Sequence, residues 1–199
     1  MMNVTDLARA YHFAARKHVD QRRKGAAAEP YMNHLTEVAE LVAAGTDGED
    51  LELIIAAVLH DTVEDTDTTP AELADLFGAR VAGVVAEVTD DKSLPKAERK
   101  RLQVEHAAQA SPGARIIKLA DKTANLRALA ASPPTGWEKE RVSEYVAWAG
   151  DVVQNCRGAY PWLEMQFDEA EKTLRLRSEL AQVTAHAHHP ASNISADRK

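Results

Sequence analysis

The sequence has little of what would point to a secreted, membrane-bound or nucleic-acid-binding protein. Cys156 is the only cysteine in 199 residues, so no internal disulfide can form. No run of about 18 apolar residues occurs, and the N-terminal stretch lacks the apolar core of a signal peptide. The net charge of −7 argues against a general nucleic-acid or membrane-surface binder, although a local basic patch would suffice for a small phosphate ligand. We therefore expect a cytoplasmic protein with neither nucleic acid nor membrane as a partner.

The chain also lacks the alternating pattern of β-strands, an internal repeat and any sign of a second domain. Aromatic residues make up only 5%, whereas Ala, Leu and Val are abundant, which suits helices packed closely together. A chain of 199 residues is long enough for one domain with a full core. We therefore predict a single all-α domain over residues 1–180, a bundle of about nine or ten helices, and a disordered polar tail at 181–199.

The stretch from Leu51 to Thr66, LELIIAAVLHDTVEDT, begins as an apolar helix and ends in acidic and imidazole groups. His60 and Asp61 follow the apolar part, and Glu64 and Asp65 come three and four residues after Asp61. If the helix continued that far, three carboxylates would share one face and repel, and a bound cation would relieve the repulsion. The alternative is the polar end of an ordinary core helix.

Two further candidates lie in other predicted helices. His34 opens the helix after Tyr31, and alone it is more often a capping or core histidine than a ligand. Asp121 lies inside the apolar helix 114–130, with Asn125 one turn later on the same side. A carboxylate in such a place must be paired, hydrogen-bonded or metal-bound.

Together, these helices supply two imidazoles and two carboxylates, from His34, His60, Asp61 and Asp121. Such a set suits a divalent transition metal, for example manganese, iron or zinc. Ligands from three helices can surround one ion and leave a position for water, whose pKa the metal lowers. Glu64 and Asp65 lie one turn beyond and could orient that water or take its proton.

Basic residues precede and follow these candidates. Arg22-Arg23-Lys24 comes before an alanine-rich loop, and it is either a solvated helix end or a phosphate clamp, since arginine offers bidentate donors. Lys96 starts a basic helix and could reach a ligand, whereas we expect Arg99, Lys100 and Arg101 on its solvated face.

The order H…HD…D is the signature of the HD phosphohydrolase superfamily. Five blocks extend the likeness: QRRKGAAAEPYMNH, VLHDTVEDT, EVTDDKSLPKAERK, KLADKTANLR and PTGWEKERVSEY. In this order they resemble the small alarmone hydrolases, stand-alone relatives of the RelA/SpoT hydrolase domain that also occur in animals. The resemblance covers roughly residues 3–175, which is nearly the whole predicted domain.

The resemblance implies a single HD-domain bundle and a manganese-dependent reaction in which metal-activated water removes the 3′-diphosphate of ppGpp or pppGpp. It assigns the metal to His34, His60, Asp61 and Asp121, and the catalytic role to Glu64 and Asp65. It also implies six substrate contacts: Arg23, Lys24, Lys96, Asn125, Arg141 and Tyr145. Of these, Arg23 would stack near the base and Lys24 would contact phosphate.

Departures from the family pattern leave affinity and base preference open, namely Leu35 after the metal histidine, Thr123-Ala124 before Asn125, and the alanine-rich loop. One alternative function is another nucleotide phosphohydrolase, above all a phosphatase acting on the 2′-phosphate of NADPH. A second is a non-catalytic alarmone-binding module, which would require loss of a ligand or of the acidic pair. The sequence does not reveal the oligomeric state, the metal used in the cell, or a partner synthetase.

Overall fold

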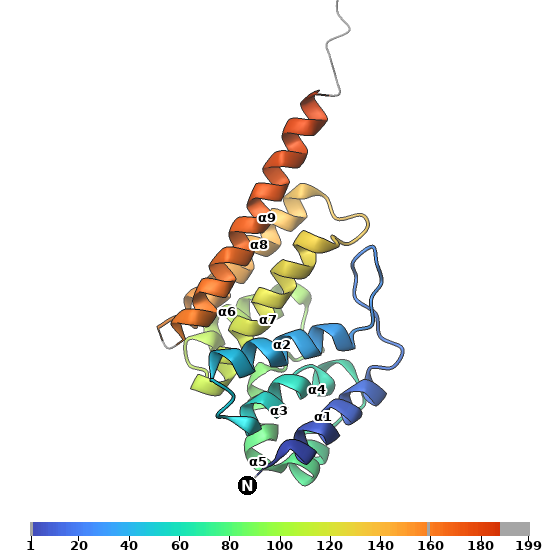
Figure 1. Cartoon of the computed structure of the whole chain (residues 1–199), viewed down its shortest axis with the longest axis vertical. Coiled ribbons are helices and arrows are strands. Elements are labelled where there is room, and N and C mark those ends of the chain that lie inside the picture. The colour runs from blue at the N-terminus through green and yellow to red at the C-terminus, as the bar shows by residue number, and fades with distance from the viewer. Residues whose placement is uncertain (1, 159, 188–199) are drawn as a thin grey trace, which may run out of the picture.

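The computed structural model of the protein describes residues 2–158 and 160–187, and it is built from helices (Figure 1). In chain order these are α1 (Val4–Lys17), α2 (Met32–Gly45), α3 (Leu51–Leu59), α4 (Thr62–Asp65), α5 (Pro70–Val88), α6 (Lys96–Ala107), α7 (Pro112–Ala131), α8 (Lys139–Gln154) and α9 (Pro161–Ala187). The described residues contain isolated bridges but no β-strand. The all-α prediction is confirmed. Because α4 is a single turn, eight full helices remain, slightly fewer than the nine or ten expected.

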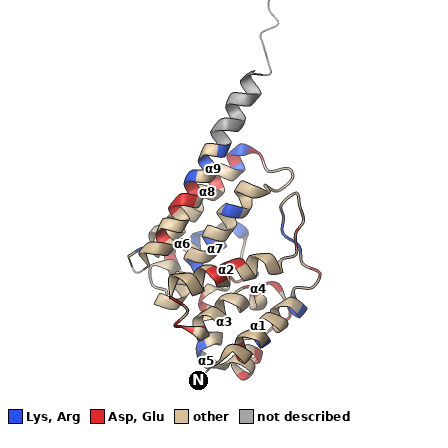
Figure 2. Ribbon diagram, viewed as in Figure 1, with Lys and Arg blue, Asp and Glu red and all other residues tan. Residues whose placement is uncertain are grey.

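The core forms where α2, α3 and α7 meet. α3 packs against α1, α2 and α5, while α7 packs against α2, α8 and α9. The side chains of Leu35, Ile55, Leu59, Ile116 and Leu119 are fully buried there. α3 carries one charged residue, Glu52, and is almost entirely tan in Figure 2, as expected for a helix surrounded by others. The core therefore fixes the relative positions of α2, α3 and α7.

A smaller apolar cluster joins α6 to α8. It contains Ala107, Val152 and Cys156, with Val104 and Trp148 packed against it. Cys156 is a free, buried thiol, as expected for a small apolar residue. This cluster attaches the basic helix α6 to α8, and so to the rest of the bundle.

The central stretch is not one continuous helix. α3 ends at Leu59 and α4 begins at Thr62, so His60 and Asp61 occupy the junction. The Thr62 hydroxyl donates a hydrogen bond to the Leu59 carbonyl oxygen at 2.6 Å, which stabilises the turn in place of a regular helix. Asp61 instead caps the separate turn α4, which bears Glu64 and Asp65, and the Asp65 N–H donates to the Asp61 carbonyl oxygen at 2.9 Å. The turn redirects α4, so that Glu64 and Asp65 face the pocket described below.

α9 continues past Leu180, the predicted end of the domain, to Ala187. The remainder of the predicted disordered tail, 188–199, lies outside the described residues. None of the described helices combines the length and apolar character needed to cross a bilayer.

Candidate active site

The four candidate metal ligands converge between α2, the α3–α4 junction and α7. His34 Nε2 lies 3.2 Å from Asp121 Oδ1 and 3.6 Å from Asp61 Oδ2. His60 Nε2 lies 3.1 Å from the same Asp61 oxygen. One ligand atom from each of His34, His60 and Asp121 falls within 4.8 Å of the others. These four residues, here called the metal cluster, are thus close enough to surround one ion.

The donor atoms of this cluster fit a divalent cation. His60 Nδ1 donates to the Ala57 carbonyl oxygen at 2.8 Å, which leaves the lone pair on Nε2. This Nε2 is buried and makes no hydrogen bond, although it points toward the cluster. A histidine held by a backbone carbonyl on one nitrogen and free on the other is the usual arrangement of a metal ligand.

The electrostatics of the cluster also favour a positive charge. Burial lowers the pKa of His60, but the carboxylates of Asp61 and Asp121 outweigh it and raise that pKa to about 9. Burial raises the pKa of Asp61, yet His60 and His34 bring it well below its usual range. The pKa of Asp121 is likewise held low, despite burial, by Lys122 and His34. A proton and a metal ion would compete for this place.

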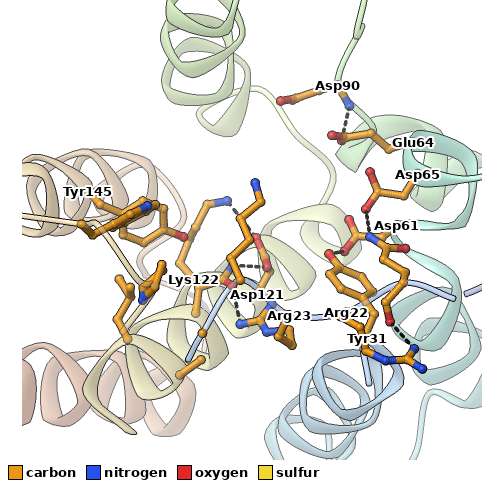
Figure 3. Close-up of a pocket in the computed structure, with 18 of the residues that line it drawn as sticks. Arg22, Arg23, Tyr31, Asp61, Glu64, Asp65, Asp90, Asp121, Lys122 and Tyr145 are labelled. Atoms are coloured by element: carbon orange, nitrogen blue, oxygen red, sulfur yellow. Dashed lines mark hydrogen bonds and ion pairs between the residues drawn. The ribbon is translucent and has the colours of Figure 1, made fainter. Parts of the chain in front are cut away.

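Neighbouring side chains fix the orientation of both carboxylates (Figure 3). The Tyr31 hydroxyl donates to Asp61 Oδ2 at 2.6 Å. The Asn125 amide donates to Asp121 Oδ1 at 2.6 Å, and Lys122 Nζ lies 2.8 Å from Asp121 Oδ2. Such outer contacts orient metal ligands and tune their basicity.

Glu64 and Asp65 stand one turn beyond the cluster and are held differently. Glu64 accepts a hydrogen bond from the Asp90 backbone N–H at 3.0 Å, and Arg99 lies 3.7 Å away. Burial raises the pKa of Glu64 to about 7, with a further contribution from nearby acidic residues. A carboxyl group with a pKa near neutrality can both accept and return a proton at physiological pH. Asp65 contacts Gln21 and Lys92.

These groups line a cavity of about 690 Å³. Its lining contains all six of the predicted substrate contacts: Arg23, Lys24, Lys96, Asn125, Arg141 and Tyr145. Arg23 also donates to the Asn125 amide oxygen at 3.0 Å, and the Arg141 guanidinium lies 4.5 Å from the centre of the Trp137 ring. Asn125 thus contacts both Arg23, a predicted substrate-binding residue, and Asp121, a candidate metal ligand.

The sequence analysis missed part of the basic side of the cavity. Arg99 and Lys100 were expected in solvent but line the cavity, so that expectation was wrong; Arg101 is exposed and paired with Glu98, as expected. Lys118 and Lys122, on α7, also line the cavity and are only 6% and 5% exposed. Helical spacing could have revealed them. Lys96, Arg99, Lys100 and Gln103 share one face of α6, and Lys118, Asp121, Lys122 and Asn125 share one face of α7.

The Trp148 ring contacts two lysines that line the cavity, Lys100 and Lys122. The ammonium groups of Lys122 and Lys100 lie 4.6 Å and 4.7 Å from the centre of the Trp148 ring, at cation–π distance. Burial lowers the pKa of Lys118, and of Lys100, whose neighbour Lys96 adds to the effect. We call Lys96, Lys100, Lys118, Lys122 and Arg141 the basic wall. It provides positive charge beside the metal cluster.

An all-helical bundle that brings two buried histidines together with two partly buried aspartates defines the class of protein. The family model for the HD domain matches residues 10–147, and the chain belongs to this family. Within it, the likeness is to alarmone hydrolases. The Homo sapiens guanosine-3′,5′-bis(diphosphate) 3′-pyrophosphohydrolase MESH1 is 51% identical over 168 residues, which cover 84% of this chain and 92% of the human protein. The Drosophila melanogaster protein of the same name is 50% identical over 157 residues, or 79% and 88% of the two chains.

A solved structure agrees. It is described as a metazoan ortholog of SpoT that hydrolyzes ppGpp, and it matches with a TM-score of 0.82 at 45% identity, covering 86% of this chain and 97% of the other. The resemblance to small alarmone hydrolases is therefore confirmed.

Proposed function

We propose that this protein is a metal-dependent ppGpp 3′-pyrophosphohydrolase, which converts ppGpp to GDP and pyrophosphate, and pppGpp to GTP and pyrophosphate. The observation that carries the proposal is the metal cluster, which lies beside a cavity whose lining includes the five residues of the basic wall. A nucleotide with two diphosphate groups needs both features, one for the reaction and one for its negative charge. Relatives with half of their residues identical carry the name of this activity.

We assign His34, His60, Asp61 and Asp121 as the ligands of one divalent ion per chain, and we propose manganese. Two imidazoles and two carboxylates suit a borderline transition metal better than they suit calcium or magnesium. Bound there, the ion would polarise a phosphoryl oxygen and lower the pKa of water. The hydrogen bonds from Tyr31 and Asn125 would hold the two carboxylates in the orientation that binds it.

The remaining roles fall to side chains around the cluster. Asp65 orients the attacking water, and Glu64 accepts its proton as the new oxygen–phosphorus bond forms and the bond to the 3′ oxygen breaks. Lys24, Lys96 and Arg141 offset the charge of the phosphates, and Lys100, Lys118 and Lys122 add to this. Arg23 stacks near the base, close to Asn125 and Tyr145. Charge-assisted contacts of this kind position the phosphates for in-line displacement.

One assay tests the proposal. Purified protein with manganese and ppGpp should release pyrophosphate, and removal of the metal by chelation should stop the release. NADPH, run beside it, should release phosphate much more slowly. Preferred turnover of NADPH would replace the substrate assigned here, and tight ppGpp binding without turnover would indicate a binding module instead. We further propose a cytoplasmic location, because the one cysteine, Cys156, leaves no internal disulfide to argue for secretion.

A further inference from the structure

Two residues outside the assigned site, Gln21 and His18, reach the acidic pair through a chain of hydrogen bonds. We propose that Gln21 and His18 are positioning residues that hold the Asp65 carboxylate in its reactive orientation. This inference rests on the proposed function, in which Asp65 orients the attacking water. It adds two residues to which neither the family signature nor the pocket charges assign a role.

The contacts define a direct path. Gln21 Nε2 lies 2.7 Å from Asp65 Oδ2, and Gln21 Oε1 lies 2.5 Å from His18 Nδ1. An ionised carboxylate can only accept, so Gln21 must present its amide nitrogen to Asp65 and its oxygen to His18. His18 must then donate from Nδ1. Each member of the path fixes the hydrogen-bonding direction of the next.

His18 is suited to hold the amide still. It is 3% exposed, and its ring stacks on Tyr31 with 5.3 Å between ring centres and 24° between planes. Tyr31 in turn donates its hydroxyl proton to Asp61, a candidate metal ligand. A buried, stacked imidazole has little rotational freedom, so the Gln21 amide that it binds has little freedom either.

The backbone reinforces this arrangement. Tyr31 N–H donates to the Gln21 carbonyl oxygen at 3.0 Å, and Arg22 pairs with Pro30 in an isolated antiparallel bridge. Gln21 and Tyr31 therefore form the neck of the loop that carries Arg23 and Lys24. Since these are main-chain contacts, replacing the Gln21 side chain leaves them in place. The loop can then be kept while the contact to Asp65 is removed.

The two oxygens of Asp65 are held unequally. Oδ2 is bound by Gln21, in the more enclosed direction, whereas Oδ1 is paired with Lys92, whose side chain is 49% exposed. An exposed lysine exchanges partners readily, because a surface ion pair is weak. We infer that Oδ1 contacts the attacking water, while the hydrogen bond from Gln21 to Oδ2 holds the plane of the carboxylate fixed.

Replacing Gln21 by methionine, which has a similar length and no hydrogen bond, should lower kcat by about 10- to 100-fold. KM for ppGpp and the manganese affinity should stay within about twofold, because the loop and the metal cluster are untouched. Gln166→Met is the matched control, since Gln166 is a half-buried glutamine on α9 that contacts Arg127. An unchanged kcat in Gln21→Met, or a rise in KM alone, would overturn the proposal.

A double-mutant cycle separates positioning from general loss of structure. Asp65→Ala alone should lower kcat strongly, and adding Gln21→Met to it should cause no further decrease, because the contact is already gone. If the two effects multiply instead, Gln21 does not act through Asp65. For His18, asparagine keeps a donor near the Nδ1 position and should retain most of kcat, whereas leucine should behave like Gln21→Met.

A spectroscopic test does not depend on turnover. The side-chain amide resonances of Gln21 should be shifted and slow to exchange in the wild type, and they should move toward ordinary values in Asp65→Ala. Unchanged resonances would mean that the contact does not exist in solution. If ppGpp is not hydrolysed at all, the proposed function fails while this measurement still decides whether Gln21 binds Asp65.

Discussion

His60, Asp61 and Asp121 of the metal cluster line the same cavity as the basic wall, but most residues of the two groups are held in opposite ways. Both carboxylates of the cluster are hydrogen-bonded by neighbours on α7 or by Tyr31, so their orientation is fixed before any ligand arrives. In the basic wall, Lys122 pairs with Asp121, but Lys100 and Lys118 form no ion pair with any described residue, and Lys100 contacts the Trp148 ring instead. The comparison teaches that the chemical side of the pocket is preorganised, whereas the binding side keeps positive charge that only an anion can neutralise.

This difference predicts that a substitution in the metal cluster has the largest effect on activity. Asp121→Ala should remove bound manganese and reduce turnover of ppGpp by at least about 1,000-fold, since the metal supplies several kcal/mol of stabilisation. Metal content of the purified variant and pyrophosphate release measure the two effects. A variant that keeps its activity would show that the cluster is not the reactive centre.

The next largest effect concerns the acidic pair, Glu64 and Asp65. The metal cluster does not need this pair to bind the metal. Glu64→Gln should keep manganese and lower kcat by about 100-fold or more. In the wild type, Glu64 must lose its proton to act as a base, so kcat/KM should rise with pH up to about 7 and then level off. The variant should lack this limb of the pH profile. An identical profile in both proteins would assign the ionisation to another group.

The smallest effect belongs to the basic wall, where several charges share the task. Lys118→Met should raise KM for ppGpp by about tenfold and leave kcat within a few-fold, because one charge-assisted contact is lost from several. Arg101→Met is the control on α6, since Arg101 is exposed and, among the described residues, pairs with Glu98 and Glu105 of its own helix. If kcat fell by a larger factor than KM rose, Lys118 would act in the reaction itself. The contrast between the metal cluster and the basic wall would then be wrong.

The sequence predicts the cluster better than the wall for a physical reason. A carboxylate inside an apolar helix is costly unless it is bound, so Asp121 stands out in the sequence, and the His60-Asp61 pair stands out at the end of an apolar run. A lysine on an amphipathic helix carries a weaker signal, because its ordinary place is in solvent and only its spacing from a residue such as Asp121 points to the cavity. Whether the Lys100 face of α6 meets water or α8 depends on packing through Val152 and Cys156, which is a tertiary contact.

The all-α fold and most helices follow from periodicity, but the turn at His60 and Asp61 does not. Leu51 to Asp65 has helical spacing throughout, and at the junction the Thr62 hydroxyl and His60 Nδ1 compete with the helix for backbone carbonyl oxygens. The role of Gln21 was also hidden, since an amide in a polar loop has no pattern that links it to a carboxylate far along the chain. Such contacts depend on how the loop folds back on α4.

The loop after Gln21 also meets the one between α7 and α8. Gly25 forms an isolated bridge with Pro134, and a methyl group at residue 25 would lie only 2.4 Å from the Ser132 carbonyl oxygen. Any other amino acid there must push apart the segments that bear Arg23 and Lys24 on one side and lead to Arg141 on the other. Gly25 and Pro134 both line the cavity, so the close approach of its two loops depends on a residue that has no side chain.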